Sequence, residues 1–154
     1  MFNIKPLWQR NPKWGKAKLG FSNLEIEDYG CTLTCLTMLI NYLEGANYTP
    51  DYVNGKLKQA KAFTGALIIW SRVPIAFPVL KFIKRGHNYS NLEVSNYIYL
   101  KKLPVMVEVN ADSIGGLYHW VLFIGERKII DPWTGTIRST STYPTTGYSL
   151  YQKK

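Results

Sequence analysis

The sequence predicts an α+β fold in which N-terminal helices pack on an antiparallel sheet. Apolar residues recur at helical spacing in residues 31–43, whereas strand-like runs fill most of the chain after Pro104. Helices first and strands later is the order typical of α+β proteins, because parallel doubly wound folds alternate the two. At 154 residues and 46% hydrophobic content, the chain has the size of one domain, residues 1–154, with enough apolar residues for a core.

Residues 1–23 are predicted to form an ordered arm. Pro6 and Pro12 prevent a long helix in this segment. A disordered arm would leave several large apolar side chains in water, namely Phe2, Ile4, Leu7, Trp8 and Trp14. We therefore expect the arm to pack on the rest of the domain.

A helix that begins at about Gly30 is the central predicted element. Asp28 and the small Gly30 suit a helix entry, and apolar residues then line one face: Leu33, Leu36, Leu39, Ile40 and Leu43. Cys31 lies in the first turn, where the positive end of the helix dipole and the unpaired N–H groups favour the thiolate. Cys35 is expected to be a core residue, and both cysteines to be reduced, because residues four apart on a helix rarely reach disulfide geometry.

Local signals predict four further elements before Pro104. They are a helix over residues 49–60 with Thr49 as N-cap, a short helix or turn in residues 65–78, a strand near residues 79–83, and a helix from Ser90 to about Lys102. Ser90 and Glu93 have the spacing of a capping box at the start of the last helix.

Two strands are predicted after Pro104, over residues 105–109 and 118–124, with a loop at residues 112–116 between them. The second strand shows too little alternation of apolar and polar residues to be half exposed. We therefore expect it to be central in the sheet.

A third strand over residues 128–130 should pair antiparallel with the central strand. If the turn between them is tight, this pairing brings His119 and Asp131 to the same end of the two strands. Residues 136–151 are expected to supply short edge strands around a turn at residues 145–147.

A thiol, an imidazole and a carboxylate are the three groups that hydrolysis through a cysteine needs, and Cys31, His119 and Asp131 supply them. Each also has a structural explanation, since single Cys and His residues are commonly core residues and Asp before Pro commonly begins a turn. A zinc site from Cys31, Cys35 and His119 matches structural zinc spacing poorly, so no metal or cofactor is expected. His87 is expected to be exposed.

The formal charge of +9 is concentrated between Asp51 and Glu93, where several basic residues occur with no carboxylate. Such a surface attracts polyanions, whether a cell-wall polymer, a nucleic acid or an anionic membrane face. The alternative is that the charge keeps the domain soluble, and without a nucleic-acid-binding motif we favour this alternative. Residues 1–20 have no apolar run typical of a signal peptide, and no stretch approaches a membrane span.

The order of Gln9, Cys31 at a helix start, His119 opening a strand and Asp131 before Pro132 resembles that of papain-like cysteine peptidases. Within this superfamily the chain resembles peptidase family thirty-nine, whose founding members are the double-glycine bacteriocin-processing peptidases. Within that family it resembles the stand-alone proteins, which are frequent in bacteria and phages. The resemblance covers most of the chain and is weakest over residues 63–91. It rests on residues 9–14, 19–20, 30–31, 48–54, 104–107, 119–121 and 131–135.

The resemblance implies a papain-like fold and a role for each residue. Cys31 would be the nucleophile, His119 the base that takes its proton, and Asp131 the group that holds the imidazole in the useful tautomer. Gln9 would donate its amide, together with the backbone N–H of Cys31, to the oxyanion. Many papain-like enzymes carry this glutamine six residues before the cysteine, where Glu25 stands here, so the role requires the arm to fold back over the site.

The implied function is that of a cysteine peptidase or thiol hydrolase that acts on a peptide or protein substrate without a cofactor. We expect it to act in the cytoplasm or in a phage particle. Two alternatives remain from the sequence. One is a catalytically silent papain-like binding or inhibitor module that acts through the basic face, and the other is a cell-wall amidase or endopeptidase.

Overall fold

The computed structural model describes the backbone of residues 1–154 and every side chain except that of Leu117. The α-helices are α1 (Ile26–Tyr29), α2 (Cys31–Glu44), α3 (Pro50–Gln59), α4 (Val73–Ala76) and α5 (Asn91–Ser95). The strands are β1 (Phe63–Thr64), β2 (Leu67–Ile68), β3 (Leu80–Gly86), β4 (Val105–Ala111), β5 (Gly116–Gly125), β6 (Lys128–Asp131), β7 (Thr136–Ser139) and β8 (Thr145–Lys153). Short 3-10 or π turns lie at Trp70–Arg72, Asn96–Leu100, Asp112–Ile114 and Thr140–Thr142.

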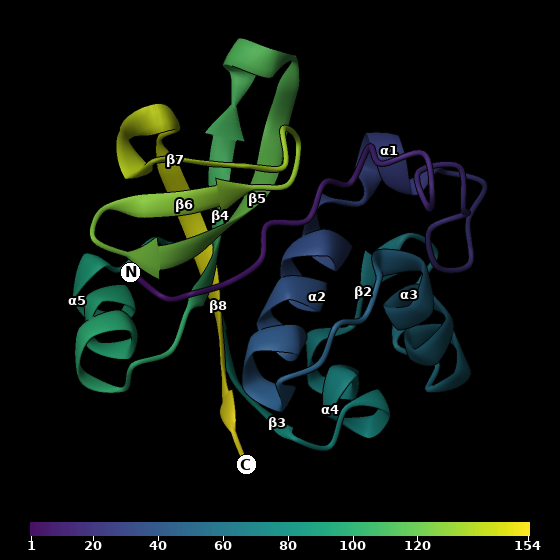
Figure 1. Ribbon diagram of the computed structural model, residues 1–154, viewed down its shortest axis with the longest axis horizontal. Helices are drawn as coiled ribbons and strands as arrows, with labels where there is room; N and C mark the ends of the chain where they lie inside the picture. The colour runs from purple at the N-terminus through teal and green to yellow at the C-terminus, as the bar shows by residue number, and fades with distance from the viewer.

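Helices α1 to α4 lie together beside a six-stranded antiparallel sheet, as Figure 1 shows. The strand order is β3-β8-β4-β5-β6-β7, so β5 lies inside the sheet, as its apolar run predicted. Strands β4 to β7 follow one another as hairpins, whereas β1 and β2 form a separate two-stranded ribbon. The predicted α+β class, with helices packed on an antiparallel sheet, is confirmed.

Helix α2 is the centre of the helical half. Residues 33–40 are all buried, because α2 packs against β4 and β5 on one side and against α3 on another. Leu33 and Leu36 are each 0% exposed, and burying a leucine contributes about 1.5–3 kcal/mol. Cys35 is also fully buried, as predicted for a core residue, and its Sγ donates to the Trp120 carbonyl at 3.5 Å.

The N-terminal arm is ordered, as predicted, and it packs on the sheet. The Phe2 N–H donates to the Ile124 carbonyl at 2.7 Å, and the Gln9 N–H donates to the Pro132 carbonyl at 2.9 Å. Between these two points Ile4 and Leu7 are buried in the core. In Figure 1 the arm is the purple segment that runs from beside the sheet to α1.

The prediction of short edge strands in residues 136–151 is right for β7 and wrong for β8. Strand β8 spans nine residues and lies between β3 and β4, and residues 145–147 begin it instead of forming a turn. Strand β8 lies inside the sheet because each face of the sheet packs on a core of its own. Tyr151 packs in the cluster that contains α2, whereas Tyr148 and Leu150 pack in a second cluster with Val94 of α5.

The predicted helix caps are confirmed only in part. Ser90 caps α5 by accepting from the Glu93 N–H, but the Glu93 carboxylate accepts from Tyr148 Oη at 2.7 Å and Lys84 Nζ at 2.9 Å. The helix continues as the π turn Asn96–Leu100. Thr49 stands at the N-cap of α3, where its side chain makes no capping hydrogen bond to the described residues.

In the part of the chain that the structure describes, no helix combines the length and the apolar character needed to cross a membrane.

We expect Gly86→Ala to destabilise the fold by about 1–3 kcal/mol, because a Cβ at Gly86 would overlap the buried ring of Tyr148. Gly55→Ala in α3 is the matched control, since a Cβ there meets nothing within 4 Å and alanine favours the helix by roughly 0.5–1 kcal/mol. Urea denaturation checks both values. Equal midpoints for the two variants would contradict the packing described at β8.

Candidate active site

The candidate nucleophile Cys31 is the first residue of α2. Helix α1 ends at Tyr29, and the Gly30 N–H donates to the Ile26 carbonyl at 2.8 Å, so the chain turns sharply from α1 into α2. A Cβ at Gly30 would lie 2.6 Å from Ile26 Cγ2, so only glycine fits this turn. The turn leaves Cys31 half-buried, with its side chain in a cavity at the helix start.

The pairing of β5 with β6 brings His119 and Asp131 together. Leu122 is paired with Ile130, and this register sets His119 Nε2 2.8 Å from Asp131 Oδ1. The other ring nitrogen, Nδ1, is then the one available to the Cys31 thiol, which interacts with the imidazole. A residue from a helix start and residues from two strands thus come together, with Cys31 and His119 lining one cavity and His119 bonded to Asp131.

Burial opposes ionisation of both the thiol and the imidazole, but their mutual attraction outweighs it. Burial by itself raises the pKa of Cys31, yet the hydrogen bond and the positive charge of His119 lower it below the ordinary value of 9.0. Burial likewise lowers the pKa of His119, and the hydrogen bonds and charges of Asp131 and Cys31 raise it to about 9. The interaction therefore shifts the pair towards thiolate and imidazolium, whereas burial raises the pKa of Cys35 well above 9.0.

Asp131 is 0% exposed, and donors surround its carboxylate. Oδ1 accepts from His119 Nε2 at 2.8 Å and from the Trp133 N–H at 2.9 Å. Oδ2 accepts from Tyr143 Oη at 2.6 Å and from Arg138 Nη1 at 3.2 Å. Burial raises the pKa of this carboxyl, but the hydrogen bonds from His119 and Tyr143 bring it below its ordinary value, so Asp131 remains ionised.

Sequence reasoning did not identify Tyr143 or Arg138 as partners of Asp131. The β6–β7 register pairs Asp131 with Thr136, and Arg138 lies two residues further on the same face of β7. If a hairpin had been predicted at residues 132–135, it would have placed Arg138 near Asp131. Tyr143 follows the turn Thr140–Thr142 and has no comparable signal in the sequence.

The structure places Gln9 in the cavity that Cys31 and His119 also line, a space of about 500 Å³ bordered by the β4–β5 loop. Gln9 is 1% exposed, so it is not the surface residue that its polarity alone would suggest. Its Nε2 donates to the Glu27 carbonyl at 3.1 Å, which uses one of its two N–H groups. The arm thus folds back to the site, as the predicted role of Gln9 requires.

One group of described side chains has oxygen atoms close enough together for a cation: Glu25, Glu27 and Asp28, within 4.8 Å of one another. Basic side chains already compensate its charge. Lys16 Nζ lies 2.6 Å from Glu27 Oε1, and Arg10 Nη1 lies 3.4 Å from Asp28 Oδ1. We assign no metal to this group. His87 is exposed, as predicted.

Comparison with known proteins gives one structural similarity. No protein-family model and no curated protein matches the chain. Among solved structures it is similar to the peptidase domain of Streptococcus ComA, a bi-functional ABC transporter involved in a quorum-sensing pathway. The identity is 17%, the match covers 82% of this chain and 93% of that chain, and the TM-score is 0.49. A similarity at this level concerns the fold alone.

We expect Asp131→Asn to slow alkylation of Cys31 by iodoacetamide at pH 6 by roughly tenfold or more. Removing the carboxylate lowers the pKa of His119, and the thiolate then loses its positive neighbour. The wild-type rate should rise at lower pH than the variant rate, because the lowered pKa of Cys31 depends on the charged imidazole. Mass spectrometry of the labelled peptides measures both profiles.

Tyr143→Phe keeps the carboxylate and removes one donor, so its effect on the same profile should be smaller and in the same direction. Cys35, whose labelling should stay slow throughout, is the internal control. Superimposable profiles for wild type and Asp131→Asn would refute the coupling of the three groups.

Proposed function

We propose that the protein is a cysteine peptidase or thiol hydrolase that cleaves a peptide or amide bond through a thioester on Cys31. The observation that supports this most is the grouping of Cys31, His119 and Asp131. His119 is bonded to a buried carboxylate, interacts with Cys31 and lines the same cavity as that thiol. A residue kept only for packing would not need this arrangement of charges.

In the proposed reaction the Cys31 thiolate attacks the carbonyl carbon of the scissile bond, and the proton of the thiol resides on His119. Asp131 accepts from Nε2 and so keeps Nδ1 directed at the reacting atoms. The oxyanion would accept from the Cys31 backbone N–H and from the second amide N–H of Gln9. His119 then protonates the leaving amine, and water hydrolyses the thioester with His119 acting again as base.

The alternative of a binding module that acts through the basic face has less support. Two of the basic residues between Asp51 and Glu93 are paired with carboxylates, namely Lys84 with Glu93 at 2.9 Å and Arg85 with Glu108 at 2.9 Å. Part of the charge counted in the sequence is therefore compensated at short range. An anionic partner and a location in the cytoplasm or a phage particle stay predictions.

Cys31→Ser and His119→Ala should each lower hydrolysis of a denatured protein substrate by roughly 10³-fold or more, because each removes a member of one chemical unit. Cys35→Ala is the matched control, since it removes the other thiol and should leave the activity in place. Iodoacetamide should also label Cys31 much faster than Cys35 near neutral pH. Activity retained in Cys31→Ser would rule the proposal out. Clearing of purified peptidoglycan would favour the cell-wall amidase alternative instead.

Gln9→Ala should reduce kcat by roughly 10²–10³-fold if the amide stabilises the oxyanion. Alkylation of Cys31 should be unchanged, because iodoacetamide forms no tetrahedral oxyanion. Gln9→Glu tests the same point with a side chain of equal length that lacks the donor. A loss of alkylation in parallel with kcat would show that Gln9 supports the structure of the site instead.

A further inference from the structure

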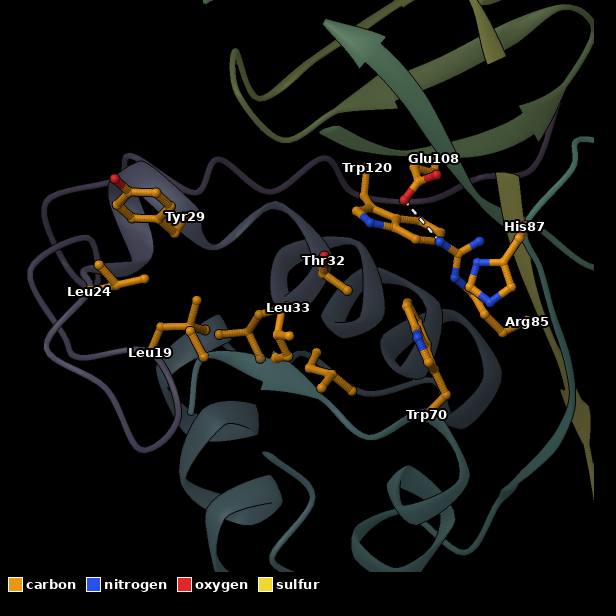
Figure 2. Close-up of a pocket in the computed structure, with 13 residues that line it drawn as sticks. Leu19, Leu24, Tyr29, Thr32, Leu33, Trp70, Arg85, His87, Glu108 and Trp120 are labelled. Carbon is orange, nitrogen blue, oxygen red and sulfur yellow. Dashed lines mark hydrogen bonds and ion pairs between the residues drawn. The ribbon is translucent and has the colours of Figure 1, made fainter. Parts of the chain in front are cut away.

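A second cavity, of about 470 Å³, adjoins the candidate active site, and the mechanism above does not use it. Tyr29 lines both cavities. Thr32 and Trp120 also line the second one, and they are the chain neighbours of Cys31 and His119. Figure 2 shows this space between Tyr29, Thr32 and two tryptophans, Trp70 and Trp120. A substrate whose scissile bond lies at Cys31 would therefore pass beside this cavity, which we call the leucine pocket.

The walls of the leucine pocket are mainly apolar, and the polar residues that also line it are Thr32, Arg85, His87 and Glu108. One side carries leucines from the arm, from α2 and from β2: Leu19, Leu24, Leu33 and Leu67. Trp70 and Trp120 form the opposite side, with ring centroids 5.0 Å apart (Figure 2). Such a lining favours an apolar occupant, because burial of apolar surface is the main favourable contribution.

The charged groups at one end of the leucine pocket are already paired with each other. Arg85 Nη2 donates to Glu108 Oε2 at 2.9 Å, and the guanidinium lies over the Trp120 ring at 4.8 Å. Glu108 Oε1 accepts from Thr146 Oγ1 at 2.8 Å. A charged side chain in the pocket would have to break this pair or stay unpaired, and both are costly in a partly buried site. The pocket therefore favours an uncharged occupant.

Large apolar side chains at the rim remain exposed. Leu67 is 75% exposed, Tyr29 is 58% exposed and Leu24 is 39% exposed. Apolar surface gathered around a cavity is typical of a binding site for an extended ligand. A peptide that places a side chain in the pocket would cover these residues.

We infer that the leucine pocket holds a large uncharged side chain of the substrate, Leu, Met or an aromatic residue, within two positions of the scissile bond. The inference rests on the proposed function and names its substrate class. Glycine would leave the cavity unfilled, so a substrate with glycine at that position should be disfavoured.

Binding of small probes to the full chain carrying Cys31→Ala tests the pocket without turnover. N-acetylphenylalaninamide should shift the indole N–H resonances of Trp70 and Trp120 with roughly tenfold or greater affinity than N-acetylglycinamide. N-acetyllysinamide should bind no better than the glycine probe. Equal affinities for the phenylalanine and glycine probes would overturn the inference.

Leu67→Asp should weaken binding of the phenylalanine probe at least about fivefold, since it puts a charge at the rim of the pocket. Leu92→Asp is the matched control, because Leu92 is 73% exposed on α5 and lines neither cavity. Unchanged binding in Leu67→Asp would place the probe elsewhere and overturn the inference. Ala66→Trp, which fills the pocket, gives a second variant if the charge disturbs folding.

Cleavage of a peptide library by the wild-type protein separates this inference from the proposed function. Mass spectrometry should find Leu, Met or aromatic residues enriched about threefold or more at one position within two of the cleaved bond. Rapid alkylation of Cys31 with cleavage confined to glycine pairs would overturn the inference and leave the proposed function standing. Slow alkylation of Cys31, equal to that of Cys35, would overturn both.

Discussion

A carboxylate withdrawn from water is the constraint on which the site depends. Asp131 is fully buried and ionised, and such a group is stable only when hydrogen bonds replace the lost solvent. Its donors come from β5, from the turn after β6, from β7 and from the segment beyond β7. The same charge that orients His119 therefore holds the edge of the sheet in register.

The ionisation of Cys31 and His119 makes the stability of the fold depend on pH in two opposing ways. His119 has a folded-state pKa of about 9, so the native protein binds more protons at this group between pH 6.5 and 9, and stability from it falls as pH rises through that window. Cys31 has a lowered pKa, so the native protein binds fewer protons there below pH 9.0, and its contribution has the opposite slope. The two contributions oppose each other, and both include the interaction between the thiol and the imidazole.

Much of this arrangement could be predicted from the sequence, because it depends on local patterns. The apolar spacing after Gly30 defined α2, and the unbroken apolar run at residues 118–124 defined the central strand. The place of β8 could not be predicted, since Thr-Thr-Gly at its start resembles a turn and its burial comes from two separate cores. Tyr143, Arg138 and the leucine pocket also depend on contacts between distant segments, which periodicity does not encode.

The arm that carries Gln9 meets a segment far along the chain. Trp8 Nε1 donates to the Trp133 carbonyl at 3.2 Å across 125 residues of sequence. A nascent chain on the ribosome has therefore made Cys31 and helix α2 long before this contact can form. Because loops of such length close slowly, the contact between the arm and the turn after β6 should form late in folding, once residue 133 has left the ribosome. The order of translation thereby separates the synthesis of the thiol from the closing of the chain beside it.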